Sequence, residues 1–486
     1  MGKSTGRPIV FGRMQFNEIL KLLPTGLSRW SLVFIWCFYT WAHFDFAPWE
    51  ERYKKVIDHD VIYYYSYLPA AFIEKDLTLD FYKDNPEHYH KSRMYWPEIL
   101  DDGSAVIKVS YGTALAYLPF FTAAHLYCQW NDNYAADGFS KPYHVAIALS
   151  GWFWMCVGFY FLRKLLIQHF TEWESSLTLL ILALATNLFY TLLLESALSH
   201  PFSFSIGCLF LWSLDRFRRA NNRQALALMA LSGGWLLVIR PTNAIYLLLP
   251  FLYWPTQTSL ADEWKWWLQQ RWRLLLALLL FILPILPQLA YWKIATGHWV
   301  SYSYTDERFF FANPHLLEGL FSYRKGWLVY TPIMLLSVFG LIQMGRGTRA
   351  FRFWPWVIAA YIYVVYSWWC WWYGGGFGSR VMVDVYPILA IALAEGVSWF
   401  WRRKNIAFPI ILLMAVGFFS WWNFRQTDQY WRWRIHYDSM TKEAYWFSVK
   451  HRHAKDVEPF EKLLKAPDYQ AAFKGEDEYP FQCWPF

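Results

Sequence analysis

Charged residues and glycines gather where long apolar segments end, and their types suit binding of a phosphate. The segment from Trp368 to Arg380, WWCWWYGGGFGSR, places three consecutive glycines and one more before an arginine. The planar fork of arginine matches two phosphate oxygens, and residues without a Cβ let the backbone approach an anion closely. This segment therefore predicts an anion site formed by Gly375, its neighbouring glycines and Arg380.

Three further turns bring polar groups to the ends of apolar segments. The turns VIRPTN, FSYRKGWLVYTP and LESALSHPFSF contain Arg240, Arg324, Lys325, Glu195 and His200. Taken singly, each has an ordinary explanation as a snorkelling or solvated group, and Arg380 could cap a helix or pair with Asp384. Ionisable groups at a membrane edge mark functional sites, so together they favour one site that binds a phosphate.

A carboxylate above such a site could act as a general base, which takes the proton from a hydroxyl as its oxygen attacks a sugar. Asp60, in IDHDVIYYYSYLPAAFIEKDL, is the best placed by sequence, and Asp58 is the alternative if the register differs by two residues. The tyrosines that follow, including Tyr64 and Tyr65, have rings suited to the faces of sugars.

The segments that must position these residues are those of an all-α polytopic membrane protein. Of the 486 residues, 56% are hydrophobic, 22% aromatic and 17% charged, whereas soluble domains have about 25% charged residues. Apolar stretches long enough to cross a bilayer recur, with tryptophan and tyrosine at their ends. We predict 11 membrane spans, at 31–47, 143–162, 174–194, 201–215, 224–239, 242–256, 274–294, 327–344, 355–373, 383–401 and 407–424.

Basic clusters predict the orientation of these spans. Arginines and lysines follow alternate spans, as at 163–164 and 402–404, which favours a cytoplasmic location for those turns and for the N-terminus. Because these clusters explain the net charge of +8, we do not expect a nucleic-acid partner. Segment 110–130 would reverse the order if it spanned, so we predict a helix that lies in the outer interface or re-enters the membrane from it. The predicted domains are a cytoplasmic segment 1–30, a membrane domain 31–424 with an outer loop 48–142, and an extracytoplasmic cap 425–486.

These residues, in this order, resemble the GT-C class of membrane glycosyltransferases, which use polyprenyl-phosphate sugars. Its members include the lipid A aminoarabinose transferase and the protein O-mannosyltransferases. The resemblance covers roughly 30–424. It rests on the early outer-loop acid Asp60, on KVSYGTALAYLPFF, and on VIRPTN, GLFSYRKGWLVYTP and WWYGGGFGSRVMVDVYP. Many members carry an Asp-Glu pair in the first loop, whereas Val61 follows Asp60 here.

The resemblance implies a GT-C helical bundle in a bacterial inner membrane, with an outer-face juxtamembrane helix and an active site facing the periplasm. It would transfer a sugar from a polyprenyl-phosphate donor to a lipid, glycan or protein acceptor. Asp60 would be the general base, and the outer arginines would hold the lipid phosphate. Some members use a divalent metal, for which Asp60, Glu195 and His200 could supply ligands. The cofactor therefore stays open.

Two other classes of membrane protein remain as alternatives. An O-antigen ligase or polymerase would also need outer arginines, to bind undecaprenyl diphosphate. Such enzymes typically carry their large loop late in the chain, whereas the large loop here precedes residue 143. A transporter of lipid-linked sugars would need polar groups within its spans, and the predicted spans carry almost no charge.

Overall fold

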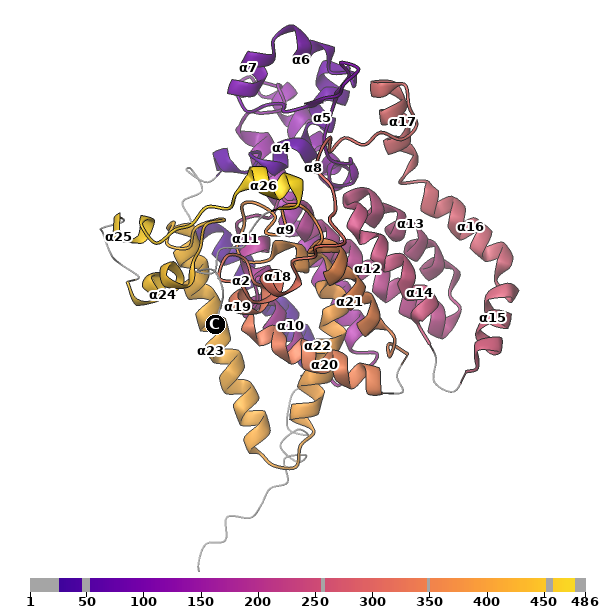
Figure 1. The fold of residues 1–486 in the computed structure, drawn as a ribbon. Helices are drawn as coiled ribbons and strands as arrows, with labels where there is room; N and C mark the ends of the chain where they lie inside the picture. Colours follow the sequence, from indigo (N-terminus) through magenta and orange to yellow (C-terminus); the bar gives the residue numbers. More distant parts are fainter. Residues whose placement is uncertain (1–25, 46–52, 255–257, 348–349, 452–457, 477–486) are drawn as a thin grey trace, which may run out of the picture.

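The computed structural model describes residues 26–45, 53–254, 258–347, 350–451 and 458–476, and most of the predicted segment 1–30 lies outside them. Helices dominate this part of the chain (Figure 1). Its only strands are β1 (Glu98–Ile99) and β2 (Ala105–Val106), which pair antiparallel. The prediction of an all-α protein is confirmed.

Residues 53–142, which belong to the predicted outer loop and are called the outer loop below, fold into helices that lie together at one end of the molecule, at the top of Figure 1. Proline at 86 begins one of them, with the side chain of Asn85 accepting from the backbone of His88. The helices are η1 (Tyr53–Lys55), α4 (Asp60–Tyr65), α5 (Tyr67–Pro69), η2 (Ala70–Glu74), α6 (Asp80–Asp84), α7 (Pro86–Lys91) and α8 (Gly112–Trp130).

The bundle beneath this loop contains the predicted spans. Its first half comprises α2 (Leu27–Asp45), α9 (Lys141–Leu166), α10 (Glu172–Leu184), α11 (Leu188–Leu193), α12 (Ser199–Ala220), α13 (Arg223–Ile239), η3 (Pro241–Leu248) and α14 (Leu249–Leu252). Its second half comprises α15 (Leu260–Gln269), α16 (Arg271–Ile282), α17 (Leu286–Thr296), α18 (Leu316–Phe321), α19 (Trp327–Tyr330), η4 (Pro332–Met334), α20 (Leu335–Arg346), α21 (Trp354–Val365), η5 (Arg380–Val385), α22 (Tyr386–Trp401) and α23 (Ala407–Trp431).

Every predicted span overlaps a helix, but few of these helices could cross a membrane alone. Within the described residues, only α9, the η5–α22 helix and α23 are long and apolar enough, and α16 with α17 would make a fourth if that pair, bent by 43°, is one span. Prolines divide several of the others, because proline lacks the N–H that continues a helix. The prediction of 11 spans is therefore not supported: the described residues contain three helices that could cross a membrane, or four if the bent pair is one span.

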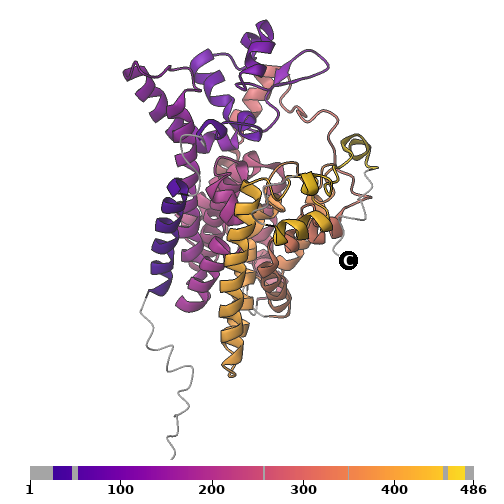
Figure 2. The same ribbon diagram turned by 90° about the vertical axis from the view of Figure 1, so that its left-hand side faces the viewer.

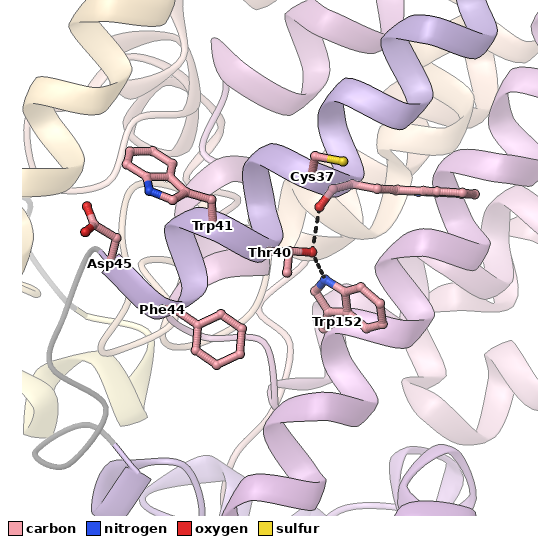
Figure 3. Close-up of a pocket in the computed structure, with 7 residues that line it drawn as sticks. Cys37, Thr40, Trp41, Phe44, Asp45 and Trp152 are labelled. Atoms are coloured by element: carbon pink, nitrogen blue, oxygen red, sulfur yellow. Dashed lines mark hydrogen bonds between the residues drawn. The ribbon is translucent and has the colours of Figure 1, made fainter.

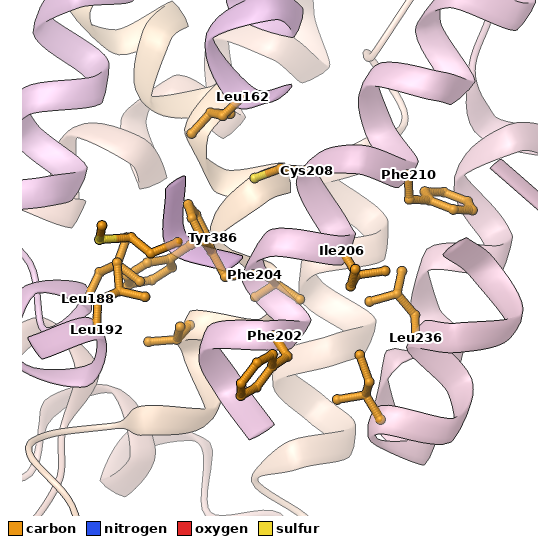
Figure 4. Close-up of a cluster of buried hydrophobic side chains, with 14 of the residues drawn as sticks. Leu162, Leu188, Leu192, Phe202, Phe204, Ile206, Cys208, Phe210, Leu236 and Tyr386 are labelled. Carbon is orange, nitrogen blue, oxygen red and sulfur yellow. The ribbon is translucent and has the colours of Figure 1, made fainter. Parts of the chain in front are cut away.

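The core lies around α12 and α22, which are buried on nearly every side. In the η5–α22 helix, 94% of the most apolar stretch is buried, against 17% in α23. Figure 4 shows side chains of α11, α12, α13 and α22 packed together, among them Phe204, Leu236 and Tyr386. A Cβ on Gly340 of α20 would come within 1.7 Å of a carbonyl oxygen of α22, so glycine is required for this close packing.

By contrast, α23 exposes a broad apolar face. Ile411, Met414 and Phe418 are each more than half exposed, although all three are strongly apolar. Exposed apolar area of this extent is unusual on a soluble monomer. Together with the apolar spans, this surface indicates that the protein is associated with a membrane.

The C-terminal region folds against the same end of the molecule as the outer loop. Its helices are α24 (Lys442–Lys450), α25 (Glu458–Glu461) and α26 (Tyr469–Lys474). Helix α23 continues to Trp431, past the predicted start of the cap at 425. Both views place the cap beside the outer-loop helices and away from the loop that joins α22 to α23 (Figures 1 and 2).

Candidate active site

A cavity of about 440 Å³ lies where the outer loop, the turn at Arg240, the glycine segment and the C-terminal cap meet. A volume of this size is typical of pockets for small ligands. Five of its lining residues are acids or bases, and most of the others are aromatic. The described lining consists of Asp60, Tyr63, Tyr64, Lys108, Val109, Ser110, Ile239, Arg240, Pro241, Thr242, Tyr302, Tyr304, Glu307, Phe309, Trp368, Trp369, Cys370, Tyr373, Gly374, Arg380 and Tyr469.

Asp60 enters this cavity from the first residue of α4. The preceding residue, His59, has a φ of 48°, so the chain turns sharply before the helix begins. The Arg380 guanidinium donates from Nη2 to Asp60 Oδ2 at 2.7 Å, across 320 residues of sequence. Burial raises the pKa of Asp60, but the charge and hydrogen bond of Arg380, with smaller effects of His200 and Arg240, outweigh it and hold that pKa below its ordinary value.

A second acid, Asp384, holds the other arginine of the cavity. Its carboxylate lies 3.2 Å from Arg240 Nε and 2.8 Å from His200 Nδ1, and the Tyr361 hydroxyl donates to it at 3.3 Å. Asp384 is fully buried, so its charge depends on these partners. The sequence left open a pair between Arg380 and Asp384, whereas the structure pairs Arg380 with Asp60 and Arg240 with Asp384.

Tyr64 is linked to Arg240 through the Ser199 hydroxyl. The Ser199 hydroxyl donates to Tyr64 Oη at 3.0 Å, and Arg240 Nη1 donates to the same serine oxygen at 3.2 Å. The tyrosine ring lines the cavity between Asp60 and Arg240. The outer loop and the N-terminal end of α12 are therefore joined directly at the site.

The glycine segment bends sharply beside these arginines. Gly374, Gly376 and Gly378 all have positive φ, of 60°, 135° and 61°, which other residues rarely adopt. A Cβ on Gly376 would also lie 3.0 Å from Cδ of Arg380. Gly375 has an ordinary φ, and a Cβ there would meet no atom within 4 Å. The predicted need for glycine therefore belongs to these three neighbours and not to Gly375, which does not line the cavity.

Two more of the predicted residues lie behind the glycine segment. The Lys325 ammonium is buried and donates to the Gly376 carbonyl. Burial and the charge of Arg380 lower the pKa of Lys325 to about 7, although Glu195 opposes this shift. Burial raises the pKa of Glu195 to about 7 against the charges of Arg380 and Lys325, and its buried Oε2 accepts no hydrogen bond. Lys325 and Glu195 therefore interact electrostatically with Arg380, but neither residue lines the cavity.

Three of the predicted residues lie outside the cavity lining. Arg324 does not line the cavity: its guanidinium lies over the Trp372 ring and donates to the Lys465 carbonyl of the cap. Tyr65 is buried on the opposite side of α4, where its hydroxyl donates to the Gly138 carbonyl. His200 is bound to Asp384, so it orients an acid and has no place in the lining. Burial next to the cap or the outer loop, which a local pattern does not show, decides these orientations.

The alternative base, Asp58, faces away from the cavity. Arg93 Nη2 lies 2.7 Å from its carboxylate, and the backbone N–H of His59 donates to it at 2.9 Å. The side chains of Asp58 and Asp60 thus have different partners, and only Asp60 meets the arginines of the site. This geometry favours Asp60 in the register that the sequence suggested.

The residues that could hold a metal ion are dispersed. Among the described residues, no group of three or more histidine, cysteine, aspartate or glutamate side chains has the spacing of a metal site. His200 is engaged by Asp384, and Asp60 by Arg380. The ligand set of Asp60, Glu195 and His200 is therefore not assembled in this arrangement.

Sequence reasoning missed the far wall of the cavity. Lys108 Nζ lies 2.6 Å from Glu307 and 3.2 Å from Glu98, which joins the outer loop to the segment before α18. Tyr304 lies beside this pair, and its burial raises its pKa. Lys108 is the first residue of KVSYGTALAYLPFF, and its position next to a predicted interfacial helix was the one feature of the sequence that could have placed it near the site. Nothing in the sequence pointed to Tyr469.

A second hollow, on the surface of α2, has a different character (Figure 3). It is lined by Trp36, Cys37, Thr40, Trp41, Phe44, Asp45 and Trp152. The Trp152 indole donates to the Thr40 hydroxyl at 2.9 Å, and that hydroxyl donates to the Trp36 carbonyl. Its polar groups bond to one another and it has a single carboxylate, so this hollow lacks the paired charges of the cavity at Asp60.

Comparison with known proteins adds no assignment to this geometry. No protein-family model matches the chain, and no curated protein matches it. The resemblance to the GT-C class therefore remains an expectation from the sequence. The function is argued below from the groups that line the cavity.

Proposed function

We propose that this protein is a membrane glycosyltransferase that moves a sugar from a polyprenyl-phosphate donor to an acceptor hydroxyl. The observation that carries this proposal is the meeting of Asp60, Arg240 and Arg380 in one cavity. Two guanidinium groups suit a phosphate, and a carboxylate beside them suits removal of a proton. The function is thus a transfer at a carbon next to a bound phosphate.

In the proposed reaction, the acceptor oxygen attacks the anomeric carbon of the donor sugar. The bond from that carbon to the phosphate oxygen breaks, and its electron pair leaves with polyprenyl phosphate. Arg240 and Arg380 stabilise the negative charge on this leaving group. The proton of the acceptor hydroxyl passes to Asp60, so atoms and charge balance.

Because Asp60 is paired with Arg380, binding of the donor phosphate would also change the basicity of Asp60. An arginine that holds a carboxylate at 2.7 Å depresses its basicity. A donor phosphate bound by Arg380 would share the arginine's charge, and the pKa of Asp60 would rise toward its ordinary value. Donor binding would therefore activate the base, and Asp60 would take up the proton only beside a bound donor.

We further propose that the bundle is of the GT-C type, with about 11 spans and the site at the outer face of a bacterial inner membrane. Its support is the segregation of charge. The site lies near the N-terminal end of α12, and the ion pairs of Asp215 with Arg219 and of Arg218 with Glu263 lie near the other end. These latter pairs fall in the basic turns that the sequence assigns to the cytoplasm.

Lipid binding tests the proposal. Native mass spectrometry of the purified protein should show undecaprenyl phosphate binding more tightly than undecaprenol, which has the same tail without the charge. Arg380→Lys keeps the charge but loses the two-pronged fork, so we expect affinity to fall on the order of tenfold. Arg93→Lys, at the ion pair with Asp58 outside the cavity lining, is the matched control and should bind normally.

Two results would count against it. Equal binding of undecaprenol and undecaprenyl phosphate would show that no phosphate site exists here. A clear preference for undecaprenyl diphosphate would instead favour an O-antigen ligase or polymerase.

A further inference from the structure

The cavity has two ends of different chemistry. Asp60, Arg240 and Arg380 occupy one end. Six further lining residues are aromatic and come from the segment after α17, the tryptophan run before the glycines, and the C-terminal cap. These six residues, which we call the aromatic wall, are Tyr302, Tyr304, Phe309, Trp368, Trp369 and Tyr469.

Contacts within the aromatic wall hold its rings in fixed positions. Phe309 and Trp368 pack edge to face with ring centroids 4.6 Å apart, and their backbones form an isolated β-bridge. Trp369 stacks on Phe473 of α26 at 3.8 Å. Rings held in this way offer apolar faces at little cost in side-chain entropy.

Tyr469 is the member that the C-terminal cap contributes. Its hydroxyl donates to Asp438 Oδ2 at 2.7 Å, and the Trp372 indole donates to that hydroxyl at 3.5 Å. Asp438 is buried, while Tyr469 remains 38% exposed and lines the cavity. The cap therefore fixes the polar tip of this tyrosine and leaves part of its ring accessible.

The lysine on this side of the cavity is held by carboxylates. Among the described lining residues, the only charged groups besides Asp60 and the two arginines are Lys108 and Glu307, which lie 2.6 Å apart. Glu98 lies 3.2 Å from the same lysine. Neither a free cation for an anionic acceptor nor a free carboxylate for a cationic one stands beside the rings.

From this arrangement we propose that the aromatic wall is the acceptor subsite, that it takes an uncharged saccharide, and that Tyr469 determines its specificity. The proposal rests on the function proposed above, which places the donor phosphate at the two arginines. Sugar rings present apolar C–H faces that pack on aromatic rings, while their hydroxyls can bond to polar groups nearby. An acceptor on the wall would direct its hydroxyl toward Asp60, across the same cavity.

Saturation-transfer NMR on the full-length protein tests this proposal without requiring any transfer reaction. The probes are cellobiose, cellobiuronic acid as its anionic counterpart, and a short serine-containing peptide. The detergent must lack a sugar headgroup, because a maltoside would compete for the site. We expect signal at the ring C–H protons of cellobiose, and weaker or no signal from the other two probes.

Variants assign that signal to Tyr469. Tyr469→Ala should weaken cellobiose binding on the order of tenfold, because a stacking face is lost. Tyr469→Phe keeps the ring and should retain most of the binding, which guards against loss through unfolding. Tyr437→Ala removes a 39% exposed tyrosine of the same cap outside the cavity lining and should bind normally.

Equal cellobiose binding by wild type and Tyr469→Ala would overturn the proposal, as would preferential binding of the peptide or of the anionic sugar. Undecaprenyl phosphate binding, measured on the same preparations, separates this proposal from the function on which it rests. Tyr469→Ala should bind that lipid normally. If cellobiose binding depends on Tyr469 but the lipid does not bind, the saccharide subsite stands and the donor assignment falls.

Discussion

At the residue scale, each of two acids forms an ion pair with one of the two arginines in the cavity. Asp384 is buried and holds Arg240, whereas the partly exposed Asp60 holds Arg380 at the cavity surface. The sequence could predict that these groups gather at one end, because each stands at the end of an apolar segment. It could not predict which acid meets which arginine, since that depends on contacts across as many as 320 residues.

Glu195 gives a prediction at this scale, for stability against pH. Burial raises its pKa from 4.5 to about 7, so the folded protein binds this proton more tightly than the unfolded chain. The associated stability is complete below about pH 4.5 and is lost as the pH rises to about 7. Glu195→Gln should therefore match wild type at pH 5 and gain on the order of 1–3 kcal/mol at pH 8.

Thermal unfolding of the purified proteins at both pH values measures this difference. Glu87→Gln is the control, because Glu87 is exposed and pairs with Lys91 on the surface. Its difference from wild type should not vary with pH. A loss of stability in Glu195→Gln at pH 8 would mean that Glu195 forms a net stabilising pair with Lys325, contrary to this account.

At the element scale, the glycine segment shows what a sequence motif can and cannot specify. The run of glycines before Arg380 predicted an anion site, and the structure shows positive φ at three of these glycines. Which glycine matters depends on φ and on neighbouring atoms, and the structure places the constraint at Gly376 and not at Gly375. Helix α26 has local signals at its ends, the N-cap Asp468 and the following Gly475, but its packing on the tryptophan run depends on contacts that a local pattern does not show.

Substitutions in this segment follow from its geometry. Gly376→Val would force a branched side chain into a φ of 135° and toward the Arg380 side chain, so we expect undecaprenyl phosphate affinity to fall at least about tenfold. Gly375→Val, one residue away, meets open space and should retain near-normal affinity. Both are measured on folded, purified protein; normal affinity in Gly376→Val would remove the glycine segment from the phosphate site.

At the scale of the whole molecule, the account requires the site and the basic turns to lie on opposite sides of a membrane. Thr305, near the cavity, and Asn405, between α22 and α23, are both exposed and serve as reporters. In a variant with the exposed Cys37 replaced by serine, a cysteine at Thr305 should react with an impermeant maleimide added to intact cells. A cysteine at Asn405 should react only after permeabilisation.

The reverse labelling pattern would place the site in the cytoplasm and exclude the proposed orientation. Sequence predicted this orientation from charge alone, since basic turns are read along the chain. The sequence analysis overestimated the number of continuous membrane spans, because breaks at proline leave several helices too short to cross a membrane alone. Several of these shorter helices pack around α12 and α22, so protein surrounds part of their surface.

The release of polyprenyl phosphate tests the central claim most directly. The purified protein, reconstituted with polyprenyl-phosphate sugars and lipid extract from its own cells, is followed by mass spectrometry of the lipids. Wild type and Asp58→Asn should convert the donor to polyprenyl monophosphate. Asp60→Asn should be slower on the order of 10²–10⁴-fold while still binding donor, because it lacks the proton acceptor. Equal release by Asp60→Asn and wild type, or no release by wild type, would contradict the account.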